Sequence, residues 1–137
     1  MKIVILDRDG VINQDSDAYI KSPEEWIPID GSIQAIADLC IAGFKVVVAT
    51  NQSGLGRKLF SNDDLTSIHS KLKELVEHAN GKISGIFYCP HLPSDHCNCR
   101  KPKTGLLEKI EQDLRCSLKA SHFIGDSVRD IQAALSH

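Results

Sequence analysis

The chain has 137 residues, 42% hydrophobic and 25% charged, which is enough for one hydrophobic core and too short for two domains. A net charge of −2 at pH 7 excludes a broad basic surface for nucleic acid or anionic lipid. The first apolar run, residues 3–6, meets Asp7 before it reaches the length of a signal sequence or a membrane span. We therefore expect a single domain over residues 1–137, cytoplasmic and monomeric, without a nucleic-acid or membrane partner.

Short apolar runs typical of buried strands alternate with helical patterns along the chain. The expected strands cover residues 3–6, 44–49, 83–88 and 122–124, and the helical patterns begin near residues 31, 61, 106 and 128. Ser61 is placed to cap the second helix, while Gly43 and Asn80-Gly81 are expected to end the first and second helices. This alternation predicts an α/β fold, a three-layer, Rossmann-like parallel sheet with helices on both faces.

Polar residues follow the expected strands at the sheet edge where α/β proteins bind ligands. Strand one ends in Asp7-Arg8-Asp9-Gly10. Two carboxylates one residue apart can serve as a nucleophile beside a general acid, or as ligands for a hard cation. They can equally do no more than cap a turn, because aspartate is a favoured turn residue.

Two further strand ends carry weaker signals of the same kind. Thr50-Asn51-Gln52-Ser53-Gly54 offers a hydroxyl, amides and a glycine, as a phosphate cradle needs, although most such stretches are only loops. Asp126 follows the fourth strand, where an aspartate alone is more often a helix N-cap than a ligand.

A basic segment, Arg100-Lys101-Pro102-Lys103, lies between these strands in the sequence. It could neutralise a bound phosphate, with either lysine as the charged partner. Basic clusters are usually solvated surface. This one directly follows a group of cysteines that would fix its position.

That group has the composition of a metal site. The chain has an odd number of cysteines, five, and Cys89, Cys97 and Cys99 crowd into one short segment with His91. Three thiolates and one imidazole close a tetrahedron around zinc without an open position, which predicts a structural metal. His96 is an alternative fourth ligand, and a loop of free thiols is the alternative to any metal. Cysteines and histidines outside this segment are expected at surface or packing positions.

The combined motifs resemble those of the haloacid-dehalogenase-like hydrolase superfamily. Within it, the strings ILDRDGVIN, ATNQSG, CPH…CNCRKP and GDSVRD are similar to those of the D-glycero-D-manno-heptose-1,7-bisphosphate 7-phosphatases, and of the related histidinol-phosphatases. The likeness covers essentially the whole chain. It implies a magnesium-dependent phosphatase for a phosphorylated sugar, the 7-phosphate of the heptose bisphosphate, working through an aspartyl-phosphate. Histidinol phosphate as substrate and an inactive, zinc-stabilised binding module are the alternatives.

The resemblance also implies a role for each motif residue. Asp7 would be the nucleophile and Asp9 the general acid and base, while Thr50 and Lys101 would hold and neutralise the phosphoryl group. Lys101 rather than Lys103 occupies the position of the family's lysine. The expected substrate-binding residues are Asn51, Arg100, Asp15 and Tyr19.

Two metals are implied in the same way. Mg²⁺ would bind Asp7, Asp126 and Asp9, the last through its backbone carbonyl. The family pattern selects His91 over His96, so Zn²⁺ would bind Cys89, His91, Cys97 and Cys99. In that family a fifth strand and another helix follow, giving the strand order 5-4-1-2-3. Against this pattern the chain looks C-terminally shortened at His137, which would leave its fourth strand as a sheet edge.

Overall fold

The structure, a computed structural model, describes residues 2–101, 103–115, 118 and 122–125. Its centre is a parallel sheet in the order β3-β2-β1-β4. The strands are β1 (Lys2–Leu6), β2 (Phe44–Asn51), β3 (Ile83–Cys89) and β4 (His122–Ile124). All four expected strands are therefore present, in the predicted relative order.

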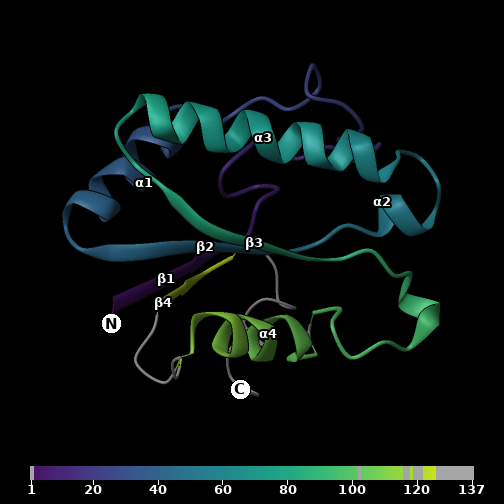
Figure 1. Cartoon of the computed structure of the whole chain (residues 1–137). Helices are drawn as coiled ribbons and strands as arrows, with labels where there is room; N and C mark the ends of the chain where they lie inside the picture. The colour runs from purple at the N-terminus through teal and green to yellow at the C-terminus, as the bar shows by residue number, and fades with distance from the viewer. Residues whose placement is uncertain (1, 102, 116–117, 119–121, 126–137) are drawn as a thin grey trace.

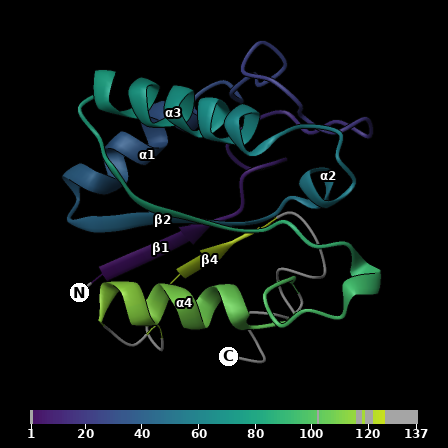
Figure 2. The same ribbon diagram turned by 45° about the vertical axis from the view of Figure 1, so that its right-hand side comes forward.

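Helices cover both faces of the sheet. α1 (Ser32–Ile41) and α3 (Asn62–His78) lie over one face, and α4 (Gly105–Leu114) lies under the other (Figure 1). Figure 2 shows the same three layers after a turn of 45°. This confirms the three-layer α/β prediction. The fourth expected helix, from Val128, falls outside the described residues.

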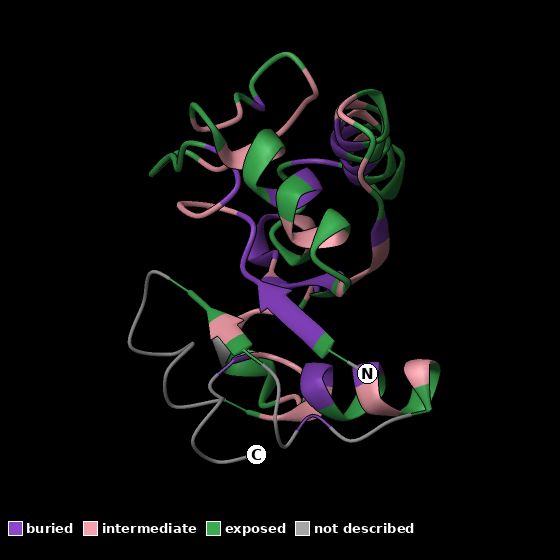
Figure 3. Cartoon of the chain, turned by 90° about the vertical axis from the view of Figure 1, so that its left-hand side faces the viewer, coloured by how far each residue is buried: buried purple, intermediate pink, exposed green. Residues whose placement is uncertain are grey.

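The buried strands explain why both layers form. Along β1, Val4 and Leu6 join the apolar cluster beneath α1 and α3, whereas Ile3 and Ile5 join the cluster above α4. A strand with both faces covered needs apolar residues at every position, which is how the run at residues 3–6 reads. Figure 3 shows β1 as a largely buried strand between the two layers.

The predicted helix boundaries agree with the structure. Ser61 caps α3 in a capping box, accepting from the Asp64 N–H at 3.1 Å while the Asp64 carboxylate accepts from the Ser61 N–H at 2.9 Å. Gly43 follows α1 with φ +94°, a backbone conformation that favours glycine. No helix in the described part of the chain has the length and apolarity needed to span a membrane.

Two short elements were not anticipated from sequence: the helix α2 (Ser53–Gly56) and the 3₁₀ turn η1 (Pro93–Asp95). α2 lies where β2 ends and is packed too closely to carry larger side chains. A Cβ on Gly54 would lie 2.3 Å from a Phe60 ring atom, and one on Gly56 would lie 2.5 Å from the Pro90 carbonyl oxygen. The glycines here permit close packing of a helix where the sequence indicated only a loop.

Candidate active site

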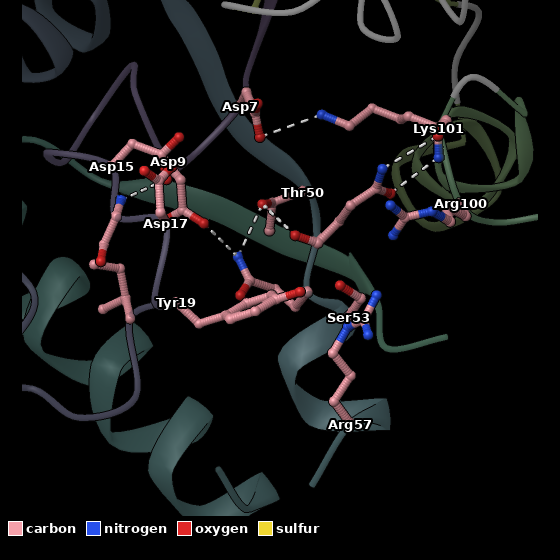
Figure 4. Close-up of a pocket in the computed structure, with 14 residues that line it drawn as sticks. Asp7, Asp9, Asp15, Asp17, Tyr19, Thr50, Ser53, Arg57, Arg100 and Lys101 are labelled. Atoms are coloured by element: carbon pink, nitrogen blue, oxygen red, sulfur yellow. Dashed lines mark hydrogen bonds and ion pairs between the residues drawn. The ribbon is translucent and has the colours of Figure 1, made fainter. Parts of the chain in front are cut away.

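A cleft of about 460 Å³ opens beyond the carboxyl ends of β1 and β2. It contains every residue predicted for catalysis or substrate binding: Asp7, Asp9, Asp15, Tyr19, Thr50, Asn51, Arg100 and Lys101 (Figure 4). Asp126, the remaining predicted magnesium ligand, lies outside the described residues. The cleft is thus formed by segments far apart in sequence that meet at the predicted sheet edge.

The innermost pair is Asp7 and Lys101. The Lys101 ammonium lies 3.2 Å from Asp7 Oδ1 and donates to the Ala49 carbonyl at 3.0 Å, with its side chain only 3% exposed. The backbone N–H of Arg8 also donates to Asp7 Oδ1, at 2.8 Å. Charge interactions strengthen where water is excluded, so this ammonium can offset negative charge at the carboxylate and at a group bound beside it.

Lys101 is placed by the end of β2. Its backbone N–H donates to Asn51 Oδ1 at 2.9 Å, and its carbonyl accepts from Asn51 Nδ2 at 3.2 Å. The Asn51 side-chain amide therefore fixes the backbone of the loop that brings Lys101 into the cleft. Lys103, the rival for this role, is exposed and does not line the cleft.

Asp9 is held by three hydrogen bonds and an ion pair. Its Oδ1 accepts from Arg8 Nε and from Asn13 Nδ2, both at 2.9 Å, and lies 2.8 Å from Arg8 Nη2 in an ion pair. Its Oδ2 accepts from Gln52 Nε2 at 3.1 Å. The same Gln52 nitrogen donates to Thr50 Oγ1 at 3.0 Å, which ties the two predicted catalytic residues together.

Arg8 is buried beneath these residues. Besides Asp9 it contacts Gln52 Oε1 at 3.3 Å and His69 Nε2 at 3.2 Å. Burial, then the charges of Arg8 and Lys73, lower the pKa of His69 from 6.5 to about 3, against a smaller opposing effect of Asp9. His69 is therefore neutral at pH 7.

Sequence reasoning did not single out Arg8, Gln52 or His69. Arg8 and Gln52 lie inside the recognised motifs, but the sequence predicted no role for either side chain. His69 was expected to be a surface or packing residue. Its only sequence signal is that it falls on the apolar stripe of α3 with Ile68 and Leu72.

The predicted zinc ligands converge on one point. The ligand atoms of Cys89, His91, Cys97 and Cys99, here called the Cys/His cluster, all lie within 4.8 Å of one another. Four of the pairs are separated by 3.3–3.7 Å, and Cys89 and Cys99 approach to 2.6 Å. Zn–S bonds of about 2.3 Å give tetrahedron edges of about 3.8 Å, so this donor set suits zinc. His96, the alternative ligand, is exposed and outside the cluster.

The thiols of the cluster differ in acidity. Burial, followed by a hydrogen bond to Cys99, raises the pKa of the Cys89 thiol. Burial also acts to raise the pKa of Cys97, but the Arg100 backbone N–H and neighbouring thiols outweigh it and lower that pKa to about 7. The cluster continues directly into the segment that carries Arg100 and Lys101 into the cleft.

The sequence and the fold of this chain are similar to those of known proteins. A family model described as polynucleotide kinase 3 phosphatase matches residues 2–136. A D-glycero-beta-D-manno-heptose-1,7-bisphosphate 7-phosphatase of Neisseria meningitidis serogroup A is 53% identical over 133 residues, covering 97% of this chain and 71% of that protein. An enzyme of the same name from Pseudomonas putida is 52% identical over 136 residues, covering 99% and 78%.

A solved structure matches as well. The crystal structure of D,D-heptose 1,7-bisphosphate phosphatase from B. bronchiseptica, complexed with magnesium and phosphate, superimposes with a TM-score of 0.96 at 51% identity. The match covers 99% of this chain and 76% of that one.

Fold and relatives together define a class of protein: a phosphoric monoester hydrolase of the haloacid-dehalogenase-like type. Within that class the chain belongs to the polynucleotide kinase 3 phosphatase family. The family resemblance inferred from the motifs is confirmed. The relatives favour the interpretation of the chain as a phosphatase over its interpretation as an inactive binding module.

The buried, neutral His69 makes a prediction about stability and pH. Its pKa is about 3 in the folded chain and near 6.5 in the unfolded chain, so the unfolded state binds the proton first as the pH falls. The stabilisation is present above pH 6.5 and is lost progressively between pH 6.5 and 3, by an amount on the order of a few kcal/mol. Urea unfolding at several pH values measures it. A His69→Gln variant should lose less stability over this range, and an equal loss in both proteins would contradict the assignment.

Proposed function

We propose that this chain removes the 7-phosphate from D-glycero-D-manno-heptose 1,7-bisphosphate. Relatives more than 50% identical over nearly the whole chain carry that enzyme name. The single observation in the site that carries the proposal is a cleft with cations at both ends. Lys101 lies beside Asp7 at the inner end, and Arg57 approaches from α2 at the other side (Figure 4).

A substrate with two phosphates suits such a cleft. The reacting phosphate would lie against Asp7 and Lys101, and the second phosphate would reach the outer arginines, Arg57 and Arg100. Arginine binds phosphate with charge-assisted, often paired hydrogen bonds. Asp15 and Asp17 also line the cleft, and their carboxylates can accept hydrogen bonds from the hydroxyls of the sugar between the two phosphates.

Histidinol phosphate is the second candidate suggested by the motifs. Its far end carries an ammonium and an imidazole rather than a phosphate, so the outer arginines would repel it when it is charged. The two aspartates would partly offset this repulsion. The balance favours the bisphosphate.

The family's description names a polynucleotide substrate. For this chain, the absence of a nucleic-acid partner stays a prediction based on its net charge of −2.

The first chemical step would be transfer of the phosphoryl group to Asp7. A carboxylate oxygen of Asp7 attacks phosphorus as the bond from phosphorus to the sugar oxygen breaks, and Asp9 gives its proton to that oxygen. Lys101 is close enough to offset the repulsion between the carboxylate and the phosphate dianion. Thr50 Oγ1 accepts a hydrogen bond from Gln52 at 3.0 Å and donates to the Asn51 carbonyl at 3.4 Å. That long bond would be exchanged for a shorter one to a phosphoryl oxygen.

The second step would return the enzyme to its starting state. Water attacks the phosphorus of the aspartyl-phosphate and gives a proton to Asp9, which releases inorganic phosphate and restores the Asp7 carboxylate. Asp7 and Asp9 offer oxygen ligands of the kind that Mg²⁺ prefers, and Asp126, outside the described residues, is the third proposed ligand. Bound Mg²⁺ would supply further charge stabilisation to the phosphoryl oxygens.

Substitution of the two aspartates tests this chemistry. We expect Asp7→Asn to abolish turnover without unfolding the chain, because only the nucleophilic charge is removed. Asp9→Asn should lower the rate on the heptose bisphosphate on the order of a hundredfold or more, through loss of acid–base catalysis. Phosphate release in the presence of Mg²⁺ measures both, with circular dichroism as the folding control. Substantial activity in the Asp7 variant would refute the covalent step.

The Cys/His cluster is the proposed site of a structural zinc. We expect protein purified without added metal to contain one zinc per chain by elemental analysis. Cys99→Ser should lose the metal and melt at a lower temperature, because metal binding contributes folding free energy. Cys40→Ser is the matched control, since Cys40 is a thiol outside the cluster. Equal zinc content in both variants would rule the site out.

Arg57 tests the assignment of the substrate. Arg57→Gln should raise KM for the heptose 1,7-bisphosphate about tenfold or more, since a hydrogen bond to a charged group contributes about 1.5–3 kcal/mol and 1.4 kcal/mol is a factor of ten. KM for the heptose 7-monophosphate, which lacks the second phosphate, should hardly change. Initial rates of phosphate release with both anomers of the bisphosphate measure the effect.

The controls separate a local effect from a general one. Lys58→Gln removes the neighbouring cation, which is exposed and does not line the cleft, and should leave KM unchanged. The unaltered enzyme should hydrolyse histidinol phosphate and a 3′-phosphorylated oligonucleotide much less efficiently than the bisphosphate. Preference for either of these would overturn the proposed substrate.

A further inference from the structure

Arg8 carries a charge that is fully buried beneath the cleft. Its exposed fraction is 0%, and it is not among the residues that line the cleft. Burying a guanidinium is costly unless it is paired and hydrogen-bonded. The Arg8 side chain makes its hydrogen bonds and ion pair with three groups, the Asp9 carboxylate, the Gln52 amide and the His69 ring.

The network makes the two oxygens of Asp9 unequal. Oδ1 accepts two hydrogen bonds at 2.9 Å, from Arg8 Nε and Asn13 Nδ2, and forms an ion pair with Arg8 Nη2 at 2.8 Å. Oδ2 accepts one, from Gln52 at 3.1 Å. A carboxylate offers about four acceptor positions over its two oxygens, so Oδ1 has no position left for a proton and Oδ2 has one.

Gln52 fixes which way the less occupied oxygen is held. Its Oε1 accepts from Arg8, and its Nε2 donates to Asp9 Oδ2 and to Thr50 Oγ1. A flipped amide would place a nitrogen against the Arg8 guanidinium and an oxygen against the Asp9 carboxylate. The amide therefore has one favourable orientation, and Arg8 determines it.

We propose that Arg8 is a positioning residue that, held by His69 and Gln52, makes Oδ2 of Asp9 the oxygen that gives and takes the proton. This rests on the proposed role of Asp9 as general acid and base. In the first step the proton leaves Oδ2 for the sugar oxygen as the bond from phosphorus to that oxygen breaks. In the second step the proton of the attacking water returns to Oδ2.

Substitution of His69 can perturb the Arg8 network without changing a residue that lines the cleft. It lies on α3, does not line the cleft, and its Nε2 is 3.2 Å from Arg8 Nη1. Arginine has only donors, so Nε2 must be the acceptor and the ring proton is assigned to Nδ1. A substitution of His69 should therefore reach Asp9 only through Arg8.

Comparing two leaving groups isolates the proton transfer. The leaving group of the heptose bisphosphate is a sugar alkoxide, which needs a proton. The leaving group of p-nitrophenyl phosphate is p-nitrophenolate, which is stable without one. We compare kcat/KM, which reports the steps up to release of the leaving group and not the later hydrolysis of the aspartyl-phosphate. His69→Leu should lower kcat/KM roughly tenfold for the sugar phosphate and by less than about threefold for p-nitrophenyl phosphate. His69→Gln, which restores an acceptor for Arg8, should recover most of the loss.

Two controls make the result decisive. Ile68→Val changes a buried neighbour on α3 outside the network and should not distinguish the two substrates. Asp9→Asn should show a larger difference between substrates than His69→Leu. If His69→Leu does not fold, His69→Met carries the same test, because it also removes the ring acceptor of Arg8 and lies outside the cleft.

The outcomes separate this inference from the proposed function. Equal losses on both substrates in His69→Leu, or no recovery in His69→Gln, would overturn the positioning role while a clear difference in Asp9→Asn leaves acid catalysis standing. No difference between substrates in Asp9→Asn would instead remove the proposed role of Asp9, and the positioning role with it.

Discussion

A carboxylate and a phosphate dianion repel one another, and the arrangement of this cleft can be understood from that constraint. Positive charge has to stand beside Asp7, out of water, where it is effective. Lys101 meets both conditions: its ammonium is 3.2 Å from Asp7 Oδ1 and its side chain is 3% exposed. A buried lysine needs its own compensation, which the Ala49 carbonyl and the carboxylate provide. The Lys101 ammonium thus connects its own loop to the end of β1, at Asp7, and to β2, at Ala49.

The loop that carries Lys101 is long and has little regular structure, so it must be fixed by other means. One anchor is the Asn51 amide, which holds the backbone of Lys101 from both sides. A second lies at the start of α4, where the Gly105 N–H donates to the Asn98 carbonyl at 2.8 Å and a Cβ would collide with that carbonyl. The Cys/His cluster joins Cys89, the last residue of β3, to Cys97 and Cys99, which flank the Asn98 anchor. A metal there would therefore rigidify the lysine's support without touching the reaction.

The sequence predicted those features that depend on local pattern. Apolar runs predicted the four strands, and Ser61 and Gly43 predicted where helices begin and end. Because ligands bind beyond the carboxyl ends of parallel strands, Asp7, Asp9 and Thr50 were predicted to lie in one cleft. It could not reveal features that depend on partners distant in sequence. Arg8 and His69 are 61 residues apart, and Arg8 and Gln52 are 44 apart. Nothing in the composition of α3 shows that one histidine on its buried stripe faces an arginine instead of a leucine.

The residues of the cleft also differ in what supports them, and this bears on how far family membership can specify a substrate. The proposed reacting residues, Asp7 and Thr50, lie at strand ends inside the sheet, where hydrogen-bonded neighbours fix the backbone. The outer residues come from segments that follow the strands: Tyr19 has a positive φ of 67°, and Arg57 follows the short helix α2. Gly54 and Gly56 allow α2 to sit against Phe60 and Pro90, so the position of Arg57 depends on contacts that loop changes would alter. The strand ends that carry Asp7 and Thr50 would therefore serve the phosphoryl transfer itself, whereas the segments that carry Tyr19 and Arg57 would determine which leaving group fits the cleft.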